Sequence, residues 1–197
     1  MRSKFPSVSL ADATLALSGG AMINLLASGM AEVLLANLRC PVIMAGNALA
    51  EVDQRCQRDN RLTAGLERLK ASELLSECEL SKHAKSIWRD LVGDGLADGI
   101  DDGDAATIAL ALTHANDTVS VLDEPKSARV LAQRWPDRVR VDTVTVLAQS
   151  ATRGQIELAT FRQGCIGALE AARMRVPDEA KEWMMSIVGA EYAARIK

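Results

Sequence analysis

The alternation of helical and strand patterns between Ala105 and Ala151 is the feature that most constrains the fold. Apolar residues at 105, 108, 109 and 112 have the spacing of an amphipathic helix. A β-branched strand follows at 118–122, then a second helical spacing at 128–135, a short strand at 139–141 and a helix at 143–151. Such an order predicts an α/β fold in which right-handed crossovers build a parallel sheet between helices.

The upstream part fits the same plan. A short apolar run at 13–17 reads as a strand, and Ser18, Gly19 and Gly20 lead into a helix that Gly29 breaks. A second apolar segment covers 31–38, the next strand covers 40–44, and Gly46 opens a helix with Ala48, Leu49, Val52 and Cys56 on one face and Glu51 beside it.

Three regions of the sequence are less regular. Residues 59–92 are charged and mostly helical, and the pattern leaves open whether 66–75 is a strand or a helix. The glycine- and aspartate-rich stretch from Gly93 to Gly103 predicts a loop. From Gln155 onward we expect helices, one with a stripe through Leu158, Phe161, Cys165, Leu169 and Ala172, and one that starts at Pro177 with Trp183, Met184 and Ile187 on its buried side.

Composition and length support one domain. The chain has 197 residues, of which 48% are hydrophobic and only 3% aromatic, as expected for helices packed on a small buried sheet. We predict a small three-layer α/β/α domain over residues 1–156 and a helical C-terminal extension, 157–197, packed on that domain.

Several classes of protein are disfavoured. No apolar run reaches the roughly 20 residues of a membrane span, and residues 1–9 lack the layout of a secretory signal, so we expect a cytoplasmic protein with no membrane partner. Cys40, Cys56, Cys78 and Cys165 are scattered, and with His83 and His114 they form no zinc pattern. The net charge of −3 argues against strong sequence-independent binding to phosphate backbones.

Acidic residues mark the predicted sheet's functional edge, because ligands of parallel sheets gather beyond the carboxyl ends of strands. Asp123 follows the strand at 118–122, Asp104 opens the preceding helix, and Glu51 lies in the helix after the strand at 40–44. Carboxylates from separate elements are suitable ligands for a hard cation such as Mg²⁺.

Each acid also has a structural interpretation. Asp101 and Asp104 suit a helix cap and its first turn, and Asp123 or Glu124 suits an N-cap before Pro125. Glu51 would then be a solvated residue at the edge of its helix.

A family resemblance joins the three acids. The run GDAATIALAL at 103–112, the strand end VLDE at 121–124 and the following KSARVLA at 126–132 resemble the PIN-domain pattern. Residues 141–156 (VDTVTVLAQSATRGQI) are similar to that family's last strand and helix, and MINLLASG at 22–29 and ALAE at 48–51 fall at the expected separation. The likeness covers roughly 14–156, with little specific in 57–93.

The resemblance implies a three-layer domain and a metal-dependent ribonuclease, a class that includes toxins of toxin–antitoxin pairs. It assigns Glu51, Asp104 and Asp123 to catalysis and to binding Mg²⁺ or Mn²⁺. RNA would be the substrate and an antitoxin-like protein a partner. We expect Ser18, Arg129 and Arg153, with Arg134 as a further candidate, to contact RNA, and the apolar terminal helices leave room for a homodimer.

One departure from the family pattern concerns the first strand. The family places an aspartate directly after it, where this chain has Ser18, and a hydroxyl adds no negative charge to a cation site. Asp12 is an alternative that lies before the strand, and Asp101, Asp102 or Glu124 are candidates to compensate.

Three hypotheses follow: a PIN-like ribonuclease with a degenerate site, a catalytically inactive binding or regulatory module on the same fold, and a nucleotide-binding protein. The last is disfavoured because the chain has neither a P-loop Lys-Ser/Thr pair nor a GxGxxG motif. A serine hydrolase is disfavoured by the absence of a GxSxG elbow.

Overall fold

The fold is built on a parallel sheet in strand order β3-β2-β1-β4-β5, as seen in a computed structural model that describes residues 5–6, 8–93, 99–154 and 156–196. The strands are β1 (Thr14–Leu17), β2 (Val42–Ala45), β3 (Ser76–Cys78), β4 (Thr118–Val121) and β5 (Arg140–Val141). Leu15 pairs with Val42 on one side and with Val119 on the other. The predicted α/β class with a small parallel sheet is confirmed.

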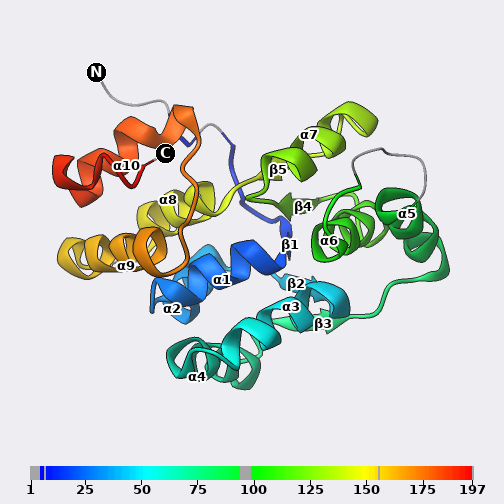
Figure 1. The fold of residues 1–197 in the computed structure, drawn as a ribbon, viewed down its shortest axis with the longest axis horizontal. Coiled ribbons are helices and arrows are strands. Elements are labelled where there is room, and N and C mark those ends of the chain that lie inside the picture. The colour runs from blue at the N-terminus through cyan, green and yellow to red at the C-terminus, as the bar shows by residue number, and fades with distance from the viewer. Residues whose placement is uncertain (1–4, 7, 94–98, 155, 197) are drawn as a thin grey trace.

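Helices connect the strands and cover both faces of the sheet (Figure 1). They are α1 (Gly19–Ala27), α2 (Ala31–Leu38), α3 (Gly46–Cys56), α4 (Asn60–Ala71), α5 (Lys82–Val92), α6 (Asp102–Thr113), α7 (Pro125–Arg134), α8 (Thr143–Arg153), α9 (Leu158–Ala171) and α10 (Lys181–Val188), with short 3₁₀ turns η1 (Asp178–Ala180) and η2 (Ala190–Tyr192).

Side chains of the central strands alternate between two hydrophobic layers. Leu15 and Leu17 pack with the buried residues of α1, α2 and α8, whereas Ala16, between them, packs with α6. β2 alternates in the same way, with Met44 in the first layer and Ile43 in the second. Because successive strand residues point to opposite faces, this sheet is buried on both sides, as expected for parallel strands.

Helix α6 differs from its prediction. The spacing at 105–112 predicts an amphipathic helix, but every residue from Gly103 to Ala111 is buried. The reason is that α5 packs on the side of α6 that faces away from the sheet (Figure 1). The predicted loop is also shorter than expected, since α6 begins at Asp102; its residues 94–98 lie outside the described part of the chain.

The stretch at 66–75, which the sequence left open as a strand or a helix, is helical as far as Ala71. Leu66 and Leu69 are buried in α4, which ends at Ala71, and a strand begins only at Ser76. That strand, β3, was not predicted because Ser76 and Glu77 are exposed at the sheet edge and give no hydrophobic pattern.

The C-terminal helices share the main core with the sheet. Phe161, Cys165 and Leu169 of α9 are buried in the same cluster as Leu15, and Met184 of α10 joins them. Trp183 and Ile187 are only half-buried against this cluster. Placing Leu158 on the buried stripe is wrong, because it begins α9 and is 67% exposed.

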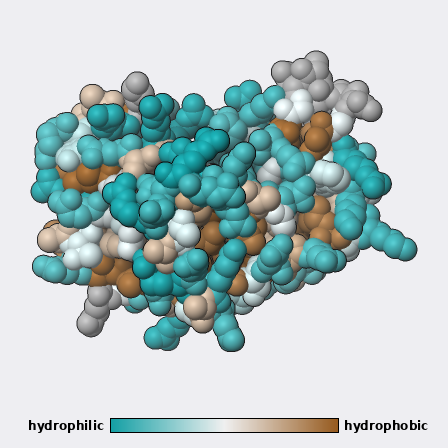
Figure 2. Space-filling view, turned by 60° about the horizontal axis from the view of Figure 1, so that its bottom comes forward, coloured by the Kyte–Doolittle hydropathy of each residue, from teal (hydrophilic) through white to brown (hydrophobic). Residues whose placement is uncertain are grey.

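The surface and the helix lengths bear on membrane contact. Within the described residues, no single helix is long and apolar enough to cross a bilayer; α1 and α2 together have the composition but are bent by 113°. Figure 2 shows a mostly hydrophilic face on which hydrophobic residues form separate patches.

The burial of α6 gives a stability prediction. Ile108 is fully buried against Leu131 and Leu122, so Ile108→Ala should lower the free energy of unfolding by about 2–5 kcal/mol. Leu158→Ala removes an exposed side chain from another helix and should change it by less than about 0.5 kcal/mol. Urea denaturation of both variants measures the difference, and equal effects would contradict the central position of α6.

Candidate functional site

An acidic cleft lies at the carboxyl ends of the central strands. Ser18 directly follows β1, α3 directly follows β2, and Asp123 lies just beyond β4. The cleft has a volume of about 960 Å³. Its charged and polar walls come from Ser18, Asn24, Glu51, Arg55, Asp101, Asp104, Asp123, Glu124, Glu170, Arg173 and Arg175. The fold therefore brings the three predicted acids, from three different elements, to one hollow.

Glu51 lies against the first turns of α1 and α6. A Cβ added to Gly19 would overlap its Oε2 atom, and one added to Gly103 would come within 2.8 Å of that atom. Within the described residues no side chain or backbone group donates a hydrogen bond to this carboxylate. Burial, followed by repulsion from Asp101 and Asp104, raises the pKa of Glu51 to about 7. The interpretation as a simply solvated edge residue is therefore wrong.

Asp104 connects the start of α6 to α7. Its Oδ2 accepts a 2.5 Å hydrogen bond from the hydroxyl of Ser127, which is completely buried. Burial is the main reason that the pKa of Asp104 rises to about 6; the Ser127 bond opposes the rise, and neighbouring Asp101 and Asp123 add to it. Asp101 is the N-cap of α6, as its sequence position predicts, through a 2.9 Å bond from the Gly103 amide.

Asp123 is held by donors on two other helices. Its Oδ1 accepts the Thr143 amide at 2.7 Å, and its Oδ2 accepts the Asn24 amide group at 2.6 Å and the Thr143 hydroxyl. Burial raises its pKa, although these three bonds favour the ionised form. Asp123 is not a helix cap: the N-cap position of α7 belongs to Glu124, which makes no capping bond.

Ser18 occupies the end of β1 inside the cleft and is 1% exposed. Its hydroxyl caps α1 by accepting the Ala21 amide at 3.3 Å. Asp12, the alternative first acid, precedes β1 and therefore lies toward the opposite edge of the sheet, so it is not part of the cleft. Ser18, and not Asp12, is therefore the residue that follows β1 at the cleft.

The candidates for compensating acids divide into two groups. Asp101 and Glu124 line the cleft, and Glu124 faces Arg175 at 3.8 Å. Asp102 does not, because its carboxylate accepts hydrogen bonds from Asn47 of α3 at 2.8 Å and from the Trp88 indole of α5 at 3.0 Å. It ties helices together instead.

Three arginines in the cleft were not identified from the sequence. Arg55 lies four residues after Glu51 on α3, a spacing that would have placed both on one side of the helix. Arg173 and Arg175 follow α9 and reach the cleft only through the packing of the C-terminal helices, so no local pattern signals them.

The predicted RNA-contacting arginines lie outside the cleft. Arg129 lines a neighbouring hollow beside α7. Arg153, at the end of α8, donates to the Leu38 carbonyl at 3.1 Å, and Arg134 stacks on Trp135 at 5.1 Å from the ring centre. Neither of these two is brought together with the acids.

The acids fit a divalent cation only in part. Among residues 5–6, 8–93, 99–154 and 156–196, no three His, Cys, Asp or Glu side chains are grouped to hold a metal ion. Asp101 and Glu124 also line the cleft. Of the three predicted acids, both oxygens of Asp123 accept one or more hydrogen bonds, whereas Glu51 and Asp104 keep an oxygen that accepts no hydrogen bond from the described residues. Mg²⁺ is commonly bound by one or two carboxylates together with water and substrate phosphate, so this pair suits an ion that binds with its substrate.

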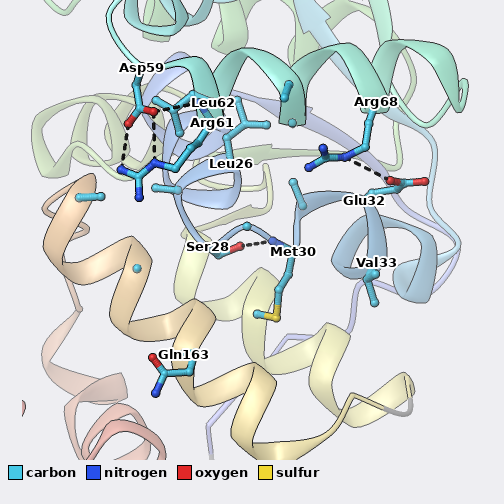
Figure 3. Close-up of a pocket in the computed structure, with 17 residues that line it drawn as sticks. Leu26, Ser28, Met30, Glu32, Val33, Asp59, Arg61, Leu62, Arg68 and Gln163 are labelled. Carbon is cyan, nitrogen blue, oxygen red and sulfur yellow. Dashed lines mark hydrogen bonds and ion pairs between the residues drawn. The ribbon is translucent and has the colours of Figure 1, made fainter.

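A separate hollow lies between the α1–α2 turn, α4 and α9 (Figure 3). Small residues form much of its lining, and its charged groups are paired with each other: Arg61 with Asp59 at 3.3 Å and Arg68 with Glu32 at 3.9 Å. It contains none of the predicted site residues.

Comparison with protein-family models, curated proteins and solved structures finds no match to this chain.

The raised pKa of Glu51 gives a pH-dependent prediction. A pKa that rises from 4.5 to about 7 on folding stabilises the protein below pH 4.5, and this stabilisation is lost as the pH increases toward 7. At pH 8 Glu51→Gln should therefore raise Tm by roughly 2–4 °C, a modest shift because water screens the partly exposed group. At pH 4.5, where Glu51 is protonated, the difference should nearly vanish.

Calorimetry at both pH values measures this effect. Glu67→Gln, on the exposed side of α4, is the matched control and should show no such pH dependence. A lower Tm for Glu51→Gln at pH 8 would show instead that the carboxylate stabilises the fold.

Proposed function

We propose that this chain is a PIN-like ribonuclease domain that acts on single-stranded RNA with Mg²⁺ or Mn²⁺, at a site weakened by Ser18. The observation that carries the proposal is the convergence of Glu51, Asp104 and Asp123, from α3, α6 and the end of β4, on one cleft. We place this activity in the cytoplasm. The resemblance to PIN domains supports the same three residues.

Each residue has a distinct role in this proposal. Glu51 and Asp104 would hold the cation, which when bound supplies a Lewis acid that activates water and neutralises charge on the phosphodiester. Asp123, fixed by Asn24 and Thr143, positions the start of α8 against the cleft and adds negative charge there. Arg55 and Arg173, which line the same cleft, supply positive charge to orient the phosphate.

The raised pKa values are consistent with such a site. Carboxylates crowded without a counter-ion retain protons at higher pH, and a bound cation reverses this by favouring the ionised forms. Cation binding should therefore strengthen as the pH rises through about 6–7, the range set by Asp104 and Glu51.

The second candidate function is a binding module without catalysis, of the kind that a toxin-like protein in complex with an antitoxin-like partner would provide. It is favoured by one specific observation: Ser18 provides a capping hydroxyl where the family pattern has a carboxylate. The two functions share a fold and differ in whether a cation binds.

Exchange of Ser18 tests the proposal. Aspartate and asparagine both cap helices as well as serine does, so Ser18→Asp and Ser18→Asn should keep α1 intact and differ only by a charge. We expect Ser18→Asp to bind Mn²⁺ about tenfold more tightly than wild type in calorimetric titration, and Ser18→Asn to bind no better. Asp104→Asn should abolish binding.

Cleavage of a labelled single-stranded RNA then separates the two functions. Mn²⁺-dependent cleavage by wild type that rises in Ser18→Asp and disappears in Asp104→Asn supports the ribonuclease. No cation binding by wild type or by Ser18→Asp would rule out the ribonuclease, and cation binding without cleavage would favour the binding module.

A further inference from the structure

A second hollow adjoins the acidic cleft beyond β4 and β5. We call it the β5 hollow. It has a volume of about 740 Å³, is walled by α7, β5 and residues 175–179, and shares Asp123 and Arg175 with the cleft. Asp123 and Arg175 therefore lie at the boundary between the two hollows.

Two arginines in the β5 hollow have no partner among the residues that the structure describes. Arg129 on α7 and Arg140 on β5 are exposed, and within the described residues neither guanidinium forms a hydrogen bond or an ion pair. They are placed on adjacent elements that both line the same space. An arginine fork matches the geometry of a phosphate group, which it binds through two parallel hydrogen bonds.

Most acids of the β5 hollow are already engaged. Asp123 accepts its three hydrogen bonds, Asp142 caps α8 by accepting the Thr145 amide at 2.7 Å, and Asp178 pairs with Lys181 at 2.7 Å. Glu179 is the remaining acidic group of the lining. Bonds from neutral amides and hydroxyls leave the charges of Asp123 and Asp142 in place, so the lining carries both signs, and its positive charge comes from Arg129, Arg140 and Arg175.

Apolar residues make up much of the remaining lining, and Gln133 is a further polar side chain in it. The apolar residues include Leu122 and Val141 at the strand ends, and Pro125, Val176 and Pro177. A hollow of this size with apolar walls and a few polar groups is typical of a small-ligand site. A nucleotide suits both the apolar lining and the arginines, because the faces of its base are flat and largely apolar and its phosphate can bind the guanidinium groups.

We infer that the β5 hollow binds one nucleotide of an RNA strand, adjacent to the phosphodiester in the acidic cleft, with Arg129 and Arg140 contacting its phosphate. This placement rests on the proposed function for the role of the cleft. The binding of the nucleotide itself requires no cation, because it depends on arginines and apolar walls.

Fluorescence anisotropy with a labelled single-stranded RNA of about eight nucleotides, in EDTA, tests this inference. Arg129→Gln/Arg140→Gln should weaken binding roughly tenfold and reduce the slope of log K against log salt by about 1.4, the effect of two lost phosphate contacts on a single strand. Arg58→Gln/Arg89→Gln removes the same charge from exposed positions outside both hollows and is the matched control. Equal behaviour of the two double variants would overturn the inference.

Competition distinguishes a nucleotide from phosphate alone. Adenosine monophosphate should displace the RNA at concentrations at which inorganic phosphate does not, because only adenosine monophosphate has a base that can contact the apolar residues of the hollow. Equal competition by inorganic phosphate would contradict a nucleotide site.

The nucleotide site and the ribonuclease can be tested independently of each other. RNA binding that depends on Arg129 and Arg140, without Mn²⁺-dependent cleavage, would retain the nucleotide site and reject the ribonuclease. Cleavage with unchanged kcat/KM in Arg129→Gln/Arg140→Gln would retain the ribonuclease and reject the nucleotide site.

Discussion

The close approach of Glu51 to Gly19 and Gly103 is the constraint on which the site depends. Helix α3 packs so tightly between the beginnings of α1 and α6 that a Cβ at Gly19 would also come within 3.2 Å of the Ala48 carbonyl. Glycine at both positions allows the carboxylate to reach the point where three strand ends meet. The result is a partly buried acid beside other acids, an arrangement that raises its pKa instead of stabilising it as an ion.

This arrangement has the character of a functional site more than of a structural one. Asp102 has two hydrogen-bond donors and joins helices, whereas Glu51 has no donor among the described residues and repels its neighbours. Uncompensated charge of this kind opposes folding and persists where binding makes use of it. Arg55 of α3, and Arg173 and Arg175 after α9, line the same cleft, so the segment that follows α9 contributes to its wall.

Much of the fold and of the acidic cleft could be predicted from the sequence. The alternating apolar runs predict the strands β1, β2, β4 and β5, and acids placed just after strands must converge at one edge of a parallel sheet. The edge strand β3 could not be predicted, because its exposed polar residues carry no periodic signal. Nor could the burial of α6 from Gly103 to Ala111, which depends on α5 packing over it, or the cleft positions of Arg173 and Arg175, which depend on how α9 docks. Local sequence patterns specify helices and strands, whereas the position of these arginines in the cleft depends on tertiary packing.

The most direct measurement of the central claim is the titration of the Glu51 carboxyl by ¹³C NMR in the metal-free protein, in wild type and in Asp104→Asn. We expect a pKa of about 7 for Glu51 in wild type, and a lower value in the variant because one repelling charge is gone. A pKa near 4.5 that does not change in Asp104→Asn would show that the two carboxylates do not share a site.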